Sequence, residues 1–134
     1  MIQPALSGEA LLADIRRSAF HVWWLGQSGF LVQYQARHLL IDPYLSDSLT
    51  RKYAATDKPH VRMTELAIAP ERLNFIDVAT SSHNHTDHLD AETLGPLLRA
   101  NPAMQLIIPE ANRQFVAERL QIDPRDLDSM TVWL

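Results

Sequence analysis

The first hydrophobic pattern along the chain has the spacing of a helix. Between residues 8 and 19 the apolar residues recur three and four positions apart, on one helical face: Leu11, Leu12, Ile15 and Ala19. Ser7 precedes this segment and has a side chain that commonly caps a first helical turn. The pattern therefore predicts a short amphipathic helix near the start of the chain.

After residue 19 the pattern becomes typical of β-strands. Three runs rich in aromatic and β-branched residues follow one another, at residues 20–25, 30–34 and 38–41. Short punctuating segments, residues 26–29 and 35–37, separate them. Runs of this composition, joined by connections this short, predict an antiparallel meander.

Residues 42–65 are polar and show no period, so we expect a long loop, a feature that is uncommon in compact domains and often functional. The loop contains four basic residues: Arg51, Lys52, Lys58 and Arg62. One interpretation is a lid that contacts a substrate phosphate or carboxylate. The other, which we prefer, is an ordinary solvated loop.

The remaining sequence alternates between strand and helix patterns. The expected elements are a buried strand over residues 75–79, a helix over 91–100 capped by Asp90, a strand over 104–108, a helix over 110–120 and a strand over 130–134. We interpret the stretch that holds Asp123, Asp126 and Asp128 as a surface turn. A meander followed by this alternation predicts a mixed α/β fold that ends before it is complete.

Composition narrows the class of protein. The chain has 134 residues, 46% of them hydrophobic, which is enough for one globular unit spanning residues 1–134. Its formal net charge of −4 argues against nucleic acid as a partner, and the absence of cysteine excludes disulfides and thiolate ligands. We find neither a secretory signal nor a membrane span, and expect a cytoplasmic protein.

The candidate chemistry lies between the strand over residues 75–79 and the helix over 91–100. His83, His85, Asp87 and His88 place four metal-binding side chains within six residues. Residues two apart in an extended segment point the same way, so His83 and His85 can reach one ion together. After a turn, Asp87 and His88 can face a second position. Imidazole with carboxylate suits zinc, iron or manganese.

A metal held here would lower the pKa of a bound water and supply hydroxide as a nucleophile. Asp87 is the candidate catalytic residue, because its carboxylate can orient that hydroxide or accept its proton. The alternative is a polar loop whose histidines bind nothing. We interpret the isolated histidines, His21, His38 and His60, as structural or exposed.

These residues resemble a known family. His83-x-His85-x-Asp87-His88 after an apolar strand is similar to the H-x-H-x-D-H motif of the metallo-β-lactamase superfamily. Residues 23–29 (Trp-Trp-Leu-Gly-Gln-Ser-Gly) look like the first hairpin of its L-ascorbate-6-phosphate lactonase-like branch. Asp42 falls where that family has an acidic residue at a strand end. It is either a group that orients a ligand histidine or an ordinary turn former.

The resemblance implies the N-terminal half of an αββα sandwich with two divalent metal ions, zinc or manganese. By this similarity, His83 and His85 hold the first ion, and Asp87 and His88 hold the second. Members of the family complete the site with residues from later strands, and this sequence has no histidine after His88. We therefore expect an open sheet face, covered by the C-terminal half of the fold or by a second copy of the chain.

Three functions follow from this resemblance. The leading expectation is a metal-dependent hydrolase that acts on a small anionic lactone or ester, with a sugar-acid phosphate lactone as the named substrate. The second is a phosphodiesterase of the same superfamily, similar to its phospholipase D-like members. The third is a non-catalytic half-fold that binds metal weakly or serves as an assembly partner.

Overall fold

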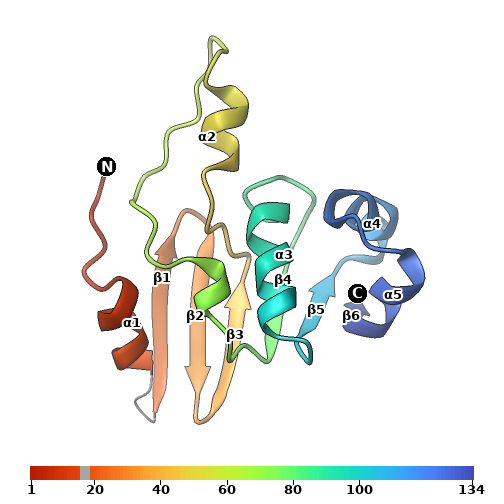
Figure 1. The fold of residues 1–134 in the computed structure, drawn as a ribbon, viewed down its shortest axis with the longest axis horizontal. Coiled ribbons are helices and arrows are strands. Elements are labelled where there is room, and N and C mark those ends of the chain that lie inside the picture. The colour runs from red at the N-terminus through yellow and green to blue at the C-terminus, as the bar shows by residue number, and fades with distance from the viewer. Residues whose placement is uncertain (16–18) are drawn as a thin grey trace.

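The computed structural model describes residues 1–15 and 19–134 and places six strands in one sheet (Figure 1). The strands are β1 (Phe20–Gly26), β2 (Gly29–Tyr34), β3 (Arg37–Ile41), β4 (Val78–Thr80), β5 (Gln105–Ile108) and β6 (Thr131–Trp133). The α-helices are α1 (Gly8–Ile15), α2 (Ser48–Tyr53), α3 (Ala91–Ala100), α4 (Arg113–Leu120) and α5 (Pro124–Met130). Two short 3₁₀ turns are η1 (Pro70–Arg72) and η2 (Glu110–Asn112).

The sheet combines two kinds of pairing. Strands β1, β2 and β3 form an antiparallel meander, whereas β3, β4, β5 and β6 pair in parallel, in the order of the sequence. Parallel neighbours need a crossover, and α3 supplies one between β4 and β5. The expected meander, the alternation after it and the α/β fold class are all confirmed.

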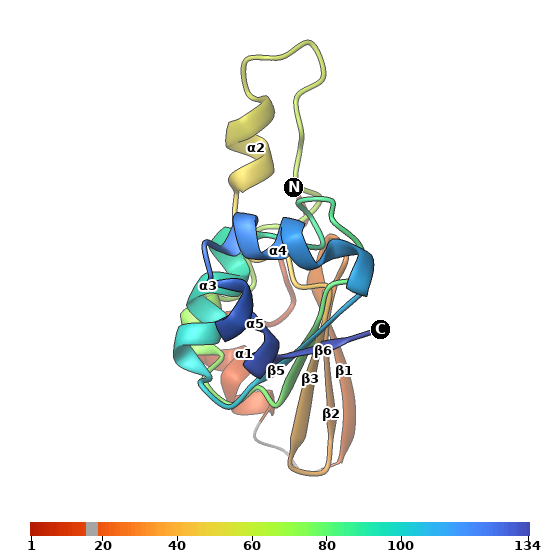
Figure 2. The ribbon, with the colours of Figure 1, turned by 90° about the vertical axis from the view of Figure 1, so that its right-hand side faces the viewer.

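The core lies between the helices and one face of the sheet (Figure 2). A row of inward side chains crosses four neighbouring strands at matching register: Leu31, Leu40, Ala79 and Leu106, all fully buried. Helices contribute Leu11, Leu94, Leu97 and Val116 to the same cluster. Because successive side chains of a strand point to opposite faces, these positions form the buried face of the sheet, and the residues that alternate with them form the other face.

That other face is apolar over β1 and β2, and the described helices all lie on the opposite side of the sheet (Figure 2). The outward side chains of β1 and β2 remain exposed in this chain: Phe20 (65%), Val22 (51%), Trp24 (44%), Phe30 (38%) and Tyr34 (62%). They are cross-strand partners, because Phe20 pairs with Tyr34 and Trp24 pairs with Phe30. A contiguous apolar surface of this kind usually marks a face that another body covers.

Several element boundaries differ from the expectation. The first helix ends at Ile15, and residues 16–18 of its expected length lie outside the described residues. The strand expected over 75–79 is β4, which is shorter and begins at Val78. The helix expected over 110–120 divides into η2 and α4.

Two helices were missed. The loop over residues 42–65 contains α2, and the supposed surface turn contains α5. Asp123 is the N-cap of α5, and its side chain accepts from the Arg125 backbone N–H. Pro124 is the first residue of the helix. This pairing of an N-cap aspartate with proline is a recognised start signal, so α5 was detectable from the sequence.

One basic residue of the loop over residues 42–65, Arg62, is buried, so the interpretation of this loop as solvated is wrong for that residue. Arg62 is 4% exposed, and its guanidinium donates to the carbonyl oxygens of Tyr44, Ser46 and Thr64. Its guanidinium also lies over the Tyr44 ring, at 4.9 Å from the centroid. Arg62 therefore fixes the base of the segment that carries α2, and it is not a free surface charge.

Gly26 allows the segment that carries α2 to approach the β1–β2 turn. Its φ of +93° lies in a region that side chains strain to adopt. A methyl group added at Gly26 would also lie 2.1 Å from Thr64 Oγ1, well inside contact distance. Glycine is thus required here for two separate reasons.

We expect Gly26→Ala to lower the free energy of unfolding by at least about 2 kcal/mol, from backbone strain and overpacking together. Gly95→Ala is the matched control, because Gly95 lies inside α3 and its added methyl group would meet only the flexible end of Arg99. That change should stabilise the protein by about 0.5–1 kcal/mol. Denaturant unfolding of both variants measures the difference, and equal effects would contradict this explanation.

Candidate metal centre

The histidine motif occupies the connection between β4 and α3. Strand β4 ends at Thr80 and α3 begins at Ala91, so residues 81–90 lie at the carboxyl end of the parallel strands. Strand β3 runs parallel to β4 and presents Asp42 immediately after its own last residue. The carboxyl ends of neighbouring parallel strands meet at one edge of a sheet, which is where α/β proteins commonly bind ligands. The topology thus brings Asp42 to the motif.

The structure gathers the motif side chains. The His83 ring lies between those of His85 and His88, with centroid separations of 4.6 Å and 4.0 Å. Asp87 Oδ2 lies 3.5 Å from His88 Nε2. His85 is exposed, whereas His83, Asp87 and His88 are half-buried. The expected residues therefore share one site, and their division between two ions stays a prediction.

Asp42 is the buried centre of this arrangement, at 5% exposure. Its Oδ1 accepts hydrogen bonds from Thr80 Oγ1 (2.9 Å) and the Ser82 backbone N–H (2.9 Å). Its Oδ2 accepts from Ser82 Oγ and lies 2.7 Å from His88 Nδ1. Burial alone would raise the pKa of Asp42, but the bonds from Ser82, His88 and Thr80 together lower it.

These contacts leave Asp42 little capacity to bind a metal directly. A carboxylate has about four lone-pair positions, and all four are engaged. With Nδ1 of His88 donating to Asp42, the Nε2 atom of that ring is left as the acceptor. Ser82 Oγ also lies 3.0 Å from His83 Nδ1. Through Ser82, Asp42 therefore helps to orient the ring of His83 as well. The geometry favours Asp42 as an orienting group over an ordinary turn former.

The side chains gathered here are of the kinds that hold a divalent metal ion. Among the described residues, Asp42, His83 and His88 each have a ligand-type atom within 4.8 Å of the others. Because Asp42 is fully hydrogen-bonded, the two histidines are the members of this cluster that are left to bind an ion. Two oriented imidazoles with nearby carboxylates suit a borderline ion such as zinc. The chain contains no cysteine that would select a softer site.

Sequence reasoning missed the side chains that hold the motif backbone. Ser28, in the β1–β2 turn, donates to the Asp87 carbonyl oxygen at 2.7 Å. Ser81 Oγ donates to the His83 carbonyl oxygen at 3.1 Å, and Arg119 of α4 donates to two further carbonyls. No local pattern points to Ser28 or Arg119, because the partners lie 59 and 35 residues apart in sequence.

Asp90 stands at the expected N-cap position of α3 but acts differently. Its side chain accepts from the hydroxyls of Thr93 (2.6 Å) and Ser48 (2.9 Å), and makes no capping bond to a backbone N–H. Thr93 Oγ1 in turn accepts from the Leu45 backbone N–H. Asp90 thus connects the helix after the motif to the segment that carries α2, and the expected capping chemistry is wrong.

A cavity of about 470 Å³ opens beside the motif and is lined by His85 and Asp87. Lys52 and Tyr53 of α2 and Phe115 and Arg119 of α4 form other parts of its wall. His60 also lines it, so this histidine is not remote from the site.

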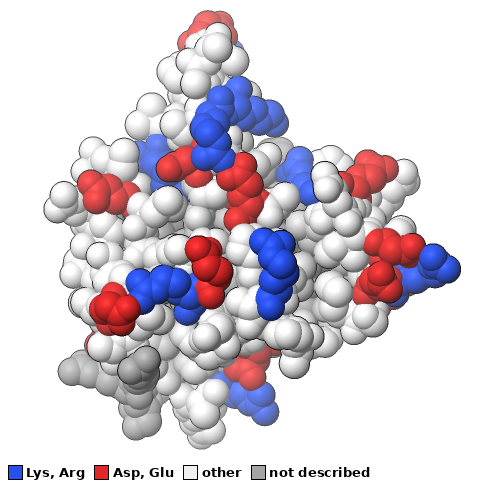
Figure 3. All heavy atoms as spheres, viewed as in Figure 1, with Lys and Arg blue, Asp and Glu red and all other residues white. Residues whose placement is uncertain are grey.

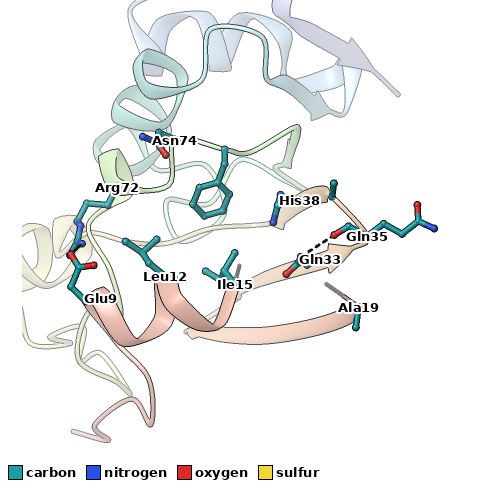
Figure 4. Close-up of a pocket in the computed structure, with 11 residues that line it drawn as sticks. Glu9, Leu12, Ile15, Ala19, Gln33, Gln35, His38, Arg72 and Asn74 are labelled. Atoms are coloured by element: carbon teal, nitrogen blue, oxygen red, sulfur yellow. Dashed lines mark hydrogen bonds and ion pairs between the residues drawn. The ribbon is translucent and has the colours of Figure 1, made fainter. Parts of the chain in front are cut away.

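A larger cavity, of about 1110 Å³, lies elsewhere, between α1 and the sheet (Figure 4). Its wall carries the Glu9–Arg72 ion pair, and Phe75 and His38 also line it. Burial lowers the pKa of His38, and the nearby Asp77 charge opposes this only in part. None of the motif residues lines this cavity, so the smaller one is the candidate substrate site.

The described residues form no basic face on the side of the molecule that the helices cover. On the side covered by the helices, lysines and arginines are interspersed with aspartates and glutamates (Figure 3). Several of them are ion-paired, as in Arg51–Glu92 and Arg113–Glu110. This distribution agrees with the net charge of −4 and gives no support to binding along a phosphate backbone.

A family model described as "Beta-lactamase superfamily domain" matches residues 21–128. The chain belongs to this superfamily. The matched range covers nearly all of the meander, the motif, α3, α4 and most of α5. The fold is accordingly part of a metallo-β-lactamase fold, and the superfamily and the two relatives below are hydrolases. Proteins of this fold usually bind divalent metals, which agrees with the side-chain cluster found here.

Two curated relatives are N-acyl-phosphatidylethanolamine-hydrolyzing phospholipases D. The mitochondrial protein of Saccharomyces cerevisiae is 37% identical over 71 residues, 53% of this chain and 14% of the relative. Phospholipase D 1 of Caenorhabditis elegans is 29% identical over 92 residues, 69% of this chain and 25% of the relative. The chain thus spans a quarter or less of either relative's length. Neither relative supports the expected lactonase branch.

Within residues 1–15 and 19–134, no helix is both long enough and apolar enough to cross a bilayer.

We expect Asp42→Asn to weaken zinc affinity about 10–100-fold, because it removes the charge that orients His88 and Ser82. Asparagine tolerates the left-handed φ of +43° at this position, so the change tests the carboxylate and spares the backbone. The free energy of unfolding should fall by roughly 1–3 kcal/mol. Zinc titration calorimetry measures the first effect and denaturant unfolding the second. The exposed Asp126→Asn is the control, and equal zinc affinity in both variants would refute the orienting role.

Proposed function

We propose that this chain is the metal-binding part of a phosphodiester hydrolase, similar in chemistry to phospholipase D. The observation that carries the proposal is the hydrogen-bonded motif, in which Asp42 holds the ring of His88 directly and contacts that of His83 through Ser82. A half-fold that only assembles with a partner would not need histidine rings fixed by a buried carboxylate. The non-catalytic alternative is therefore the weaker one.

The choice of a diester over a lactone is supported by the relatives. Both are named for hydrolysis of N-acyl-phosphatidylethanolamine, a phosphodiester, although each is matched over a small share of its length. The leading expectation from the sequence, a sugar-acid phosphate lactone, has no such support. The substrate class proposed here is accordingly a phosphodiester with an apolar portion.

We assign roles to the residues as follows. His83, His85, Asp87 and His88 would hold one or two divalent ions, zinc or manganese. A bound ion would supply Lewis acidity and lower the pKa of a water molecule. Asp87 lines the cavity and would hold that water in place or take its proton. Asp42 keeps the rings of His83 and His88 in a fixed orientation, directly and through Ser82.

The cavity beside the motif suits an anionic substrate with an apolar part. Lys52 and Arg119 supply positive charge in its wall, whereas Tyr53 and Phe115 supply aromatic surface. Both kinds of group line the same cavity as Asp87. The basic segment therefore contributes to substrate binding through Lys52, which is the lid interpretation of this loop.

The open sheet face bears on whether this chain acts alone. We propose that the exposed side chains of β1 and β2 pack against the C-terminal half of the fold or, failing that, against a second copy. The apolar cross-strand surface described above supports this, as does the far greater length of both relatives. The remaining ligands of the site would come from the covering half.

The test is an assay of the complete product of the gene, and of the 134-residue chain alone, with zinc or manganese. We expect the complete protein to hydrolyse bis(p-nitrophenyl) phosphate and N-acyl-phosphatidylethanolamine, and to leave a sugar lactone untouched. His83→Gln should lower the rate by at least about 100-fold, because it removes a ligand. The chain alone should be inactive.

His38→Gln is the control, since His38 lies on β3 in the wall of the larger cavity. Its rate should equal that of the unaltered protein. Hydrolysis of the lactone in preference to both diesters would overturn the proposed substrate class. Activity that survives His83→Gln would overturn the proposed site.

A further inference from the structure

Arg119 occupies an unusual position relative to the motif. It lies in the last turn of α4, and its Nη1 donates to the carbonyl oxygens of Asn84 (2.9 Å) and Leu89 (3.0 Å). Those two carbonyls lie on either side of His85, Asp87 and His88. One guanidinium nitrogen therefore joins the two ends of the segment that carries three of the four motif side chains.

The segment has few internal bonds of its own. The His85 carbonyl oxygen accepts from the backbone N–H groups of His88 (3.0 Å) and Leu89 (2.8 Å), which closes a single turn. Apart from that turn, the carbonyls of the motif are held by side chains from other elements. Of these side chains, Arg119 is the charged one, and charge-assisted hydrogen bonds are the stronger kind.

Arg119 is itself held in place. Its guanidinium lies 4.3 Å from the centroid of the Phe115 ring, one turn earlier on α4. Helix α4 is anchored to the core through Val116 and Ala117, which are buried. Arg119 thus fixes the motif segment to α4, a packed helix that lies outside the motif.

We propose that Arg119 is a positioning residue for the metal centre: by binding the carbonyls of Asn84 and Leu89 together, it sets the spacing of His85, Asp87 and His88. The inference rests on the metal site of the proposed function and adds a residue that no motif contains. Arginine is required, because both bonds come from one planar group with fixed N–H directions. Lysine offers a single, mobile ammonium.

The test compares Arg119→Gln and Arg119→Lys with Arg113→Gln in the 134-residue chain. Arg113 is a close match: it lies on the same helix, and its guanidinium is also 4.3 Å from an aromatic centroid, that of Trp133. Its ion pairs go to Glu110 and Asp128, away from the motif. Two quantities are measured, zinc affinity by calorimetry and amide exchange of His88 and Leu89 by NMR.

Both Arg119 variants should bind zinc about tenfold or more weakly, the usual loss when a group that supports metal ligands is removed. Exchange of the His88 and Leu89 amides should be at least about tenfold faster, as one lost charge-assisted bond implies. Arg113→Gln should leave both quantities within about twofold, because exposed ion pairs contribute little. Amides of β5, which are remote from the contact, should exchange as before.

The outcomes separate this inference from the proposed function. Unchanged zinc affinity and unchanged exchange in the Arg119 variants would overturn the positioning role. If the unaltered chain bound no zinc, the proposed function would fail, and the exchange measurement would still decide whether Arg119 holds the segment. Should Arg119→Gln fail to fold, Arg119→Lys keeps the charge and most of the packing, and the comparison then rests on that variant.

Discussion

The buried carboxylate of Asp42 is the interaction on which the candidate site depends. It accepts from Thr80, Ser82 and His88, and so connects the ends of β3 and β4 with the motif. A buried carboxylate without such partners would be costly, whereas one that is fully hydrogen-bonded makes the local structure specific. The fold therefore stabilises the charge, and the charge in turn orients the histidines.

The sheet topology makes this interaction available. The antiparallel meander ends with β3, and β4 pairs with β3 in parallel. The carboxyl ends of these two strands therefore lie at the same edge of the sheet. The segment between them carries α2 and is fixed at its base by buried Arg62. The β1–β2 turn reaches the same edge and supplies Ser28. The end of β3, through Asp42, and the β1–β2 turn, through Ser28, thus each contribute a bond to the motif.

The sequence predicted the order of elements and the motif, because both are local patterns. Four potential ligand residues within six positions, and strands with period-2 apolar positions, can be recognised without knowledge of the fold. Asp42 was a candidate only as a strand-ending acidic residue, and its partners could not be foreseen. Ser28 and Arg119 had no signal, since their contacts depend on how distant segments pack. Helix α2 is six residues long and shows no clear hydrophobic period, so the sequence did not predict it. Asp123-Pro124, by contrast, is a start signal that indicates α5.

The most direct test is ¹⁵N NMR of the histidine side chains with and without zinc. We predict that His88 carries its proton on Nδ1, where Asp42 accepts it, and that zinc shifts the Nε2 resonances of His83 and His88. The Nδ1 proton of His88 should persist in the zinc-bound protein. Zinc binding through Nδ1 of His88, or loss of the Asp42 contact when zinc binds, would contradict the role given to Asp42.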